Sequence, residues 1–154
     1  MQNYMNALEI KGEFIYKHPN SNTFTFYFED IIMKILNCTP HTINIYSVKD
    51  VVDVNDRHLH ITDGAEAQVI NPSGTVLSAK MVYEGEGYDV QRKYVGVDPA
   101  PECEDGDLII VSALYASAVK ELGGDTSKLR TVYGTVYDKA DDRKVIGCIG
   151  LCRV

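Results

Sequence analysis

The chain has 154 residues, of which 45% are hydrophobic and 24% charged, and its formal net charge is −7 at pH 7. We expect a single main core in a cytoplasmic protein without a membrane partner, because no apolar stretch reaches the roughly 18–20 residues that cross a bilayer. The acidic balance argues against a polynucleotide partner, since nucleic-acid binders concentrate Lys and Arg, but it leaves a small phosphorylated ligand open.

Residues 1–32 are predicted to form an accessory β-hairpin. Extended segments within residues 7–29 flank a turn-forming stretch at residues 18–22. Phe24, Phe26 and Phe28 alternate with Thr and Tyr, which places the three rings on one face of a strand. We expect that face to pack on the main sheet or on a second copy of the protein, because an exposed aromatic row favours aggregation.

Residues 33–154 are predicted to form one β-rich domain. Alternation of apolar and polar residues predicts strands at residues 43–46, 67–70, 76–83, 89–97, 108–111, 131–137 and 144–147. Residues 53–64 are rich in Asp and His and are predicted to be a loop.

One principal helix is predicted at about residues 113–122. Ser112 is a suitable N-cap, an apolar face follows, and Gly123 and Gly124 end the segment. The apolar face has helical spacing and consists of Tyr115, Ala118, Val119 and Leu122. The expected fold is therefore α+β, with a mainly antiparallel β-sheet, this helix and the N-terminal β-hairpin. Such a thin core favours a homo-oligomer that buries strand edges between subunits.

Two turn-forming signatures at strand ends, followed by a closing segment, are the candidate binding elements. They are residues 36–41 (LNCTPH), 71–74 (NPSG) and 147–151 (GCIGL). In the first two, a stiff Pro fixes small polar groups, which is how a scaffold presents them to a ligand. For Thr39 and His41 a structural role in a chain bend is favoured over ligand binding. Ser73 is a nucleophile only if a base such as His41 comes within hydrogen-bond reach, and the G-x-S-x-G elbow is absent.

No catalytic residue and no metal site is predicted. His58 and His60 lie near Asp53, Asp56 and Asp63, but a third ligand at a defined spacing is missing. The cysteines lack a C-x-x-C pair and are expected to be reduced thiols: Cys38, Cys103, Cys148 and Cys152.

Two arginines stand out as candidate phosphate donors. Arg57 lies in the Asp- and His-rich segment and suits a phosphate better than the neighbouring histidines suit a metal. Arg130 follows the predicted helix and precedes Tyr133. A guanidinium beside an aromatic ring suits the phosphate and the base of a nucleotide together.

A series of these segments resembles a family of small proteins carried by bacteriophages and prophages. The series comprises residues 36–43 (LNCTPHTI), 72–74 (PSG), 110–112 (IVS), Arg130 and residues 146–151 (IGCIGL). Within this group it most resembles the Thoeris anti-defence protein 1 type, a sponge for the cyclic ADP-ribose signal of bacterial TIR-domain enzymes. The similarity covers about residues 33–151. Residues 1–32 have no counterpart that can be placed, and Asn71 stands where the family usually has Pro.

The resemblance implies a β-rich homo-oligomer that inhibits Thoeris immunity in the infected bacterial cell by sequestration. Members bind glycocyclic ADP-ribose between subunits without degrading it, some also hold cyclic trinucleotides at separate sites, and no cofactor is required. In the expected ligand-binding domain, arginines serve the pyrophosphate, a ring face serves adenine, and amides or hydroxyls serve ribose. The candidate ligand-binding residues are His41, Arg57, Asn71, Ser73, Arg130 and Tyr133.

Two other functions remain open at this stage. One is a small hydrolase of a phosphorylated nucleoside, with His41 or His60 as the base. The other is a phage structural or scaffold component, favoured by the aromatic N-terminal hairpin and disfavoured by any saturable nucleotide binding.

Overall fold

The computed structural model describes residues 15–17, 23–28, 31–54 and 58–154, with side chains from residue 34 onward except that of Val54. Its N-terminal strands are β1 (Ile15–Lys17), β2 (Thr23–Phe28) and β3 (Ile31–Asn37). The middle of the chain contains β4 (Ile43–Ile45), a 3₁₀ turn η2 (Val48–Asp50), β5 (Val51–Val54), β6 (His58–Ile61) and β7 (Gln68–Ile70). The remaining elements are β8 (Ala79–Glu84), β9 (Gln91–Val97), β10 (Leu108–Ile110), α2 (Ala113–Glu121), β11 (Leu129–Tyr137) and β12 (Val145–Arg153).

The main sheet has the strand order β1-β2-β3-β10-β11-β12-β4-β7, and the β5–β6 pair joins it through β11. The α+β class and the dominance of sheet are as predicted, whereas the antiparallel character holds only in part, because the sheet is mixed. Strand β10 runs parallel to both β3 and β11, β4 runs parallel to β12, and β6 runs parallel to β11. For β10 and β11 the parallel direction follows from α2, which connects them as a crossover and returns the chain in the same direction.

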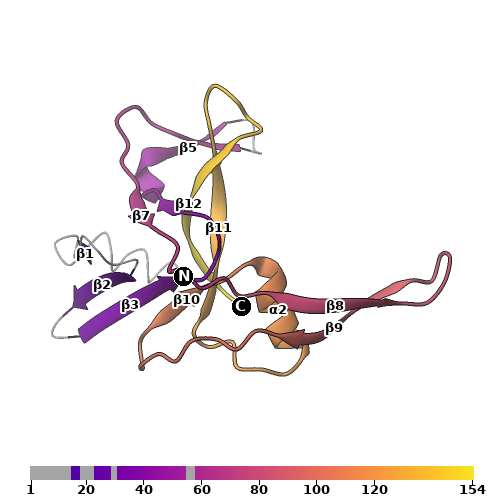
Figure 1. The fold of residues 1–154 in the computed structure, drawn as a ribbon. Helices are drawn as coiled ribbons and strands as arrows, with labels where there is room; N and C mark the ends of the chain where they lie inside the picture. Colours follow the sequence, from indigo (N-terminus) through magenta and orange to yellow (C-terminus); the bar gives the residue numbers. More distant parts are fainter. Residues whose placement is uncertain (1–14, 18–22, 29–30, 55–57) are drawn as a thin grey trace.

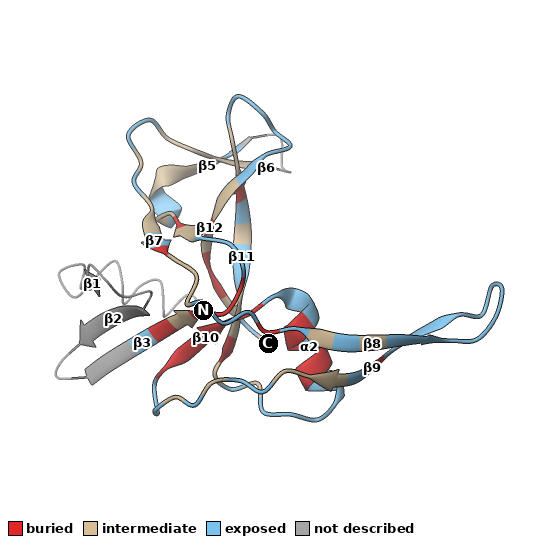
Figure 2. Ribbon diagram, viewed as in Figure 1, coloured by how far each residue is buried: buried red, intermediate tan, exposed pale blue. Residues whose placement is uncertain are grey.

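The core lies on the two faces of β10. All three residues of this strand are buried, as expected for a parallel strand covered on both sides. Leu108 and Ile110 pack in a cluster with residues of β3, β4, β7 and β12, whereas Ile109 packs in a second cluster with Tyr115 and Val119 of α2. Figure 2 shows the buried residues concentrated in β10, α2 and the adjoining parts of β11 and β12.

Helix α2 begins and ends as the sequence predicts. The Ser112 hydroxyl accepts a 3.1 Å hydrogen bond from the backbone N–H of Tyr115. At the other end, Gly123 has φ +78° and the N–H of Gly124 donates to the carbonyl of Val119 at 2.8 Å, which forms a Schellman cap. The predicted apolar face is correct except for Leu122. This residue is the C-cap, one position after the last helical residue, and is 46% exposed.

Strands β8 and β9 form a separate two-stranded sheet, which we call the arm (residues 79–97). Both strands and the turn between them match the sequence prediction. The arm extends away from the rest of the molecule, and most of its residues are exposed (Figures 1 and 2). At its base the Tyr115 hydroxyl of α2 donates a 2.7 Å hydrogen bond to the carbonyl of Asp98.

Two further sequence predictions concern the segments at 1–32 and 53–64. The predicted loop at 53–64 is wrong where it is described, because β5 and β6 pair antiparallel there. Leu59 and Ile61 alternate with His58 and His60, so the segment has the period of a strand despite its polar composition. In the N-terminal segment β1 pairs antiparallel with β2. Two predictions are not tested by the described residues. They are the shared face of the Phe24, Phe26 and Phe28 rings, whose side chains lie outside the described part, and the division of the chain at residue 32.

No helix in the described part of the chain is long and apolar enough to cross a membrane.

Candidate functional site

The side chain of Asn37 organises the first turn signature from within the core. Asn37 is fully buried at the end of β3. Its Nδ2 donates to the carbonyls of His41 at 2.7 Å and Ile70 at 3.1 Å. Its Oδ1 accepts hydrogen bonds from the backbone N–H of Thr39 at 3.0 Å and from the Thr39 hydroxyl at 2.7 Å. A buried amide with all these partners fixes the path of the chain from β3 into β4.

The second turn signature lies against the first. The backbone N–H of Ser73 donates to the carbonyl of Asn37 at 2.8 Å, and that of Leu77 donates to the carbonyl of Cys38 at 3.2 Å. Cys38 in turn donates its N–H to the carbonyl of Ile110 at 2.8 Å, which links the turn to β10. We call this set of contacts the Asn37 junction. It joins segments that lie far apart in the sequence and leaves few backbone groups unsatisfied.

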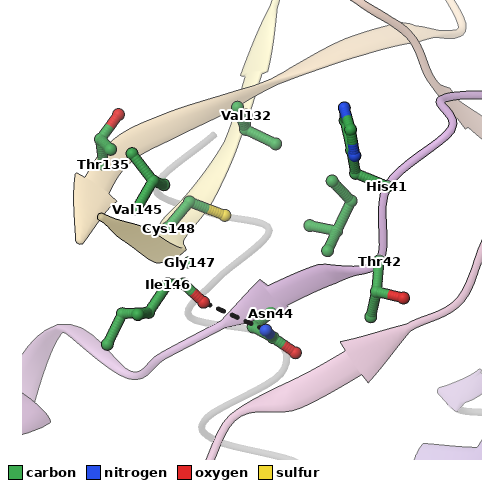
Figure 3. Close-up of a pocket in the computed structure, with 10 residues that line it drawn as sticks. His41, Thr42, Asn44, Val132, Thr135, Val145, Ile146, Gly147 and Cys148 are labelled. Atoms are coloured by element: carbon green, nitrogen blue, oxygen red, sulfur yellow. Dashed lines mark hydrogen bonds between the residues drawn. The ribbon is translucent and has the colours of Figure 1, made fainter. Parts of the chain in front are cut away.

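A pocket of about 390 Å³ lies beside the Asn37 junction, between β4 and the β11–β12 pair (Figure 3). Its polar groups come mainly from the β3–β4 turn, β4 and β11, and its apolar walls come from β4, β11 and β12. The volume falls within the range of small-molecule sites. The lining residues are His41, Thr42, Ile43, Asn44, Val132, Thr135, Val145, Ile146, Gly147 and Cys148.

The close approach of β4 and β12 forms one wall of the pocket. Asn44 Nδ2 donates a 3.0 Å hydrogen bond to the carbonyl of Ile146, shown as the dashed line in Figure 3. A Cβ atom on Gly147 would lie 2.6 Å from the carbonyl oxygen of Asn44 and 2.7 Å from the ring of Tyr46. Only glycine therefore allows this spacing, which accounts for the first residue of the closing segment at 147–151, which lies within β12.

A second glycine sets the opposite wall. Val132 and Thr135 both line the pocket, although residues three apart in a regular strand point to opposite faces. Gly134, which lies between them, has φ +70°. A Cβ atom there would lie 2.2 Å from Cγ1 of Ile149. The left-handed glycine lies between these two side chains and allows β11 to keep close contact with Ile149 of β12 at this wall.

His41 and Ser73 are the predicted site residues nearest the Asn37 junction. The structural role favoured for the first turn is correct for Thr39, but the imidazole of His41 lines the pocket. The Ser73 hydroxyl lies 3.7 Å from Cys38 Sγ and contacts the backbone of Thr75. Among the described contacts, none joins Ser73 to the imidazole of His41. Asn71 is half-buried at the start of the same turn.

Arg130 and Tyr133 lie on β11, outside the residues that line this pocket. Arg130 is two residues from Val132 and therefore on the same face of the strand, where its Nη1 donates to the carbonyls of Ser127 and Leu129 at 2.8 and 2.7 Å. Tyr133 is 48% exposed and next to Val132 in the sequence, so it points to the other face. Arg57 lies outside the described residues.

The two histidines of β6 are engaged with other side chains. His60 Nε2 lies 2.9 Å from a carboxylate oxygen of Asp142, and the His58 ring packs edge-on against Tyr137 with 4.2 Å between ring centres. Among the described residues there is no group of three or more His, Cys, Asp or Glu side chains positioned to hold a metal. His58 and His60 therefore connect the β5–β6 hairpin to β11 and to the turn that follows it.

The thiols near the site are free and protonated. All four cysteines are unbridged. Burial raises the pKa of the Cys148 thiol in the pocket wall and that of the Cys38 thiol in the junction, although a hydrogen bond from Ser73 partly offsets the effect at Cys38. Neither group is poised as a thiolate nucleophile.

Sequence reasoning gave no site role to several residues of this site, among them the polar residues Asn37, Asn44 and Thr135. Asn37 lay inside a signature that was noticed for Thr39 and His41, and an amide at the end of an apolar strand was the available signal. Thr135 follows Gly134, and glycine inside a strand pattern commonly marks a bulge or a close approach. Asn44 carried no signal that distinguishes it from an exposed strand residue.

Comparisons with protein-family models, with curated proteins and with solved structures find no match to this chain. The chemistry of the site therefore rests on its own residues and geometry.

Proposed function

We propose that the protein binds a small cyclic nucleotide of the cyclic ADP-ribose type and sequesters it unchanged, as a phage-encoded inhibitor of bacterial Thoeris immunity. A signal that is held tightly and in stoichiometric amounts cannot reach its effector, so the site has to deliver affinity rather than turnover. In this proposal the protein acts in the cytoplasm of the infected cell as a homo-oligomer.

The observation that carries the proposal is the convergence of the segments that resemble the anti-defence family. Residues 37–41 and 71–74 and the end of β10 meet at the Asn37 junction, and the N–H of Val111 donates to the carbonyl of Arg130 at 2.9 Å. The last segment of the series, on β12, forms a wall of the neighbouring pocket. Segments that lie far apart in the sequence thus build one local structure.

The pocket suits the base and ribose of such a ligand. Its walls are mostly apolar, and an imidazole, an amide and hydroxyls can orient the bound group. Asn44 uses its Nδ2 in a bond to the carbonyl of Ile146, which leaves its Oδ1 as an acceptor toward a ligand. Among the described lining residues there is no Lys or Arg. In the proposal the pyrophosphate is therefore bound by Arg130, on the same face of β11 as Val132. Arg57 is the other candidate phosphate donor and lies outside the described residues.

Binding without turnover is favoured over hydrolysis by the contacts of the candidate nucleophile and base. A hydroxyl nucleophile needs a base within hydrogen-bond reach. Among the described contacts, those of the Ser73 hydroxyl are to Cys38 and Thr75, and His60 is paired with Asp142. Burial keeps the Cys148 thiol protonated by raising its pKa. The described contacts of the pocket side chains include no nucleophile–base pair, which supports binding in this proposal.

Calorimetric titration with cyclic ADP-ribose isomers, followed by heat denaturation and mass analysis of the released ligand, tests this function. We expect saturable binding and recovery of the ligand at its original mass. A changed mass would support the hydrolase, and a flat isotherm for every isomer and for cyclic oligonucleotides would favour the scaffold component.

A pocket variant locates the site. His41→Ala should weaken binding about tenfold or more, because it removes a polar group that orients the ligand. Lys120→Ala, on the exposed side of α2, is the matched control and should bind like the wild type. Equal affinities of the two variants would exclude this pocket.

A further inference from the structure

The arm has two strand edges, and that of β8 is open and regular among the described residues. β8 pairs with β9 on one side, and no other described strand pairs with either of them. The pairing shifts register between Lys80 and Met81, which leaves Val95 as an extra residue on β9. A bulge interrupts the β9 edge and protects it from further pairing, whereas β8 continues without interruption.

The arm carries several exposed apolar side chains. Val82 is 39% exposed, Tyr83 69% and Val90 48%. A two-stranded hairpin is marginally stable alone and gains stability from a third strand or a covering face. The described body covers the base of the arm, where α2 lies, but not the strand beyond it (Figure 2).

The sequence of β8 is complementary to itself in one antiparallel register. If Val82 of two copies lie opposite each other, Lys80 of each copy lies opposite Glu84 of the other. On the other face, Met81 of each copy lies opposite Tyr83 of the other. Opposite charges, a β-branched pair and sulfur–aromatic contacts are all favourable cross-strand neighbours. The sequence of β9 lacks this complementarity. If Tyr94 of two copies lay opposite each other in a β9–β9 pair, Lys93 would lie opposite Val95, and no charge pair would be brought together.

The charge of the arm also permits two copies to approach. Residues 79–97 contain three acidic and three basic residues, whereas the whole chain carries a net charge of −7. Two arms can therefore meet without the repulsion that would oppose contact between the acidic parts of two copies. Glu84 is already 3.9 Å from Lys93 of its own chain and is exposed enough to accept a second cation.

We propose that β8 is the surface through which two copies of this chain associate, by antiparallel strand pairing about a two-fold axis at Val82. The result is a four-stranded sheet in the order β9, β8, β8 of the partner and β9 of the partner. The interface is isologous, so each copy contributes the same residues. This inference does not depend on the identity of the ligand.

A charge exchange between two single variants tests the register. K80E alone places two glutamates opposite each other, and E84K alone places two lysines opposite each other. Each variant should dimerise about tenfold to a hundredfold more weakly than the wild type in sedimentation experiments. An equimolar mixture restores both opposite-charge pairs and should recover the dimer as a heterodimer. Wild-type dimerisation by each single variant, or no recovery in the mixture, would overturn the proposal.

A crosslink provides a second test that does not require a charge change in the hairpin. Val82→Cys in the otherwise unchanged chain should form an interchain disulfide on oxidation with diamide, because residues directly opposite each other are within bridging distance. The matched control is Val95→Cys. In the proposed sheet its two copies are separated by three strand spacings of about 4.8 Å and cannot bridge. Equal crosslinking of the two variants above the wild-type background, or none, would overturn the proposal.

Discussion

The backbone N–H of Ser73 donates a 2.8 Å hydrogen bond to the carbonyl of Asn37 and thereby holds the two Pro-containing turns against each other. The Asn37 side chain meanwhile bonds to the carbonyl of Ile70, so the two turns are connected twice. This relationship makes the Asn37 junction a structural unit on which the β4 wall of the pocket depends.

Asn37→Ala should lower the free energy of unfolding by about 2–4 kcal/mol, because it leaves buried backbone groups of Thr39, His41 and Ile70 without their partners. Urea denaturation followed by circular dichroism measures the loss. Asn71→Ala, in the neighbouring turn with a half-buried side chain, should cost less than about 1 kcal/mol. Similar losses for both variants would refute the central role of Asn37.

Gly147→Ala should destabilise the protein by about 1–3 kcal/mol, because the added methyl group overlaps the carbonyl of Asn44 and the ring of Tyr46. The same substitution should weaken ligand binding, since it separates β4 from β12 at the wall of the pocket. Gly96→Ala is the control, as its Cβ would meet no atom within 4 Å. Thermal unfolding and titration calorimetry report the two effects separately.

Ser112→Ala should cost about 1 kcal/mol of stability through the loss of the α2 N-cap. Ser117→Ala lies on the exposed side of the same helix and should be neutral or slightly stabilising, because Ala has the higher helix propensity. Denaturant unfolding of both variants makes the comparison. A neutral effect at Ser112 would show that the cap bond contributes nothing.

Stability should fall as the pH rises above about 8.5, the ordinary pKa of a thiol. Burial raises the pKa of Cys148 in the folded state, so its stabilising contribution is complete below the unfolded pKa and is lost as the pH rises through the folded pKa. Urea midpoints measured between pH 7 and pH 10 should show the decline. Cys148→Ala should reduce this slope, because it removes the buried thiol.

Arg130→Ala should weaken nucleotide binding by roughly 2–4 kcal/mol if its guanidinium binds the pyrophosphate. Arg130 also donates to the carbonyls of Ser127 and Leu129, so the substitution can change stability as well as binding. The unfolding curve of the Arg130→Ala variant therefore has to be measured alongside the isotherm. Arg143→Ala removes an arginine whose side chain is 94% exposed and serves as the charge-matched control. An unchanged isotherm would remove Arg130 from the binding site.

Local signals in the sequence were sufficient to predict helix α2 and the turn of the arm. Ser112 and the Gly123–Gly124 pair located the helix, and the glycines at 85 and 87 located the turn of the arm. The parallel placement of β10 could not be predicted in this way. Three apolar residues fit a strand in either direction, and the partners of β10 are set by packing against segments far away in the chain.

The candidate site was predicted in part. The two turns were recognised because in each a stiff Pro holds small polar groups at the end of a strand, and the structure places the two turns together. The pocket itself depends on Gly134 and Gly147, whose effect is to let distant strands approach. Spacing along the sequence carries no information about such an approach, so Asn44 and Thr135 could not be predicted as neighbours.

The position of β10 has a consequence for how the chain is synthesised. Its first residue pairs with Ile35, which leaves the ribosome 73 residues earlier, and its other neighbour, β11, is made only after α2. During that interval the edge of β3 that later receives β10 has no permanent partner. Folding of the centre is therefore delayed until most of the polypeptide has been translated, and slow, non-local parallel pairing of this kind exposes the nascent chain to misassembly.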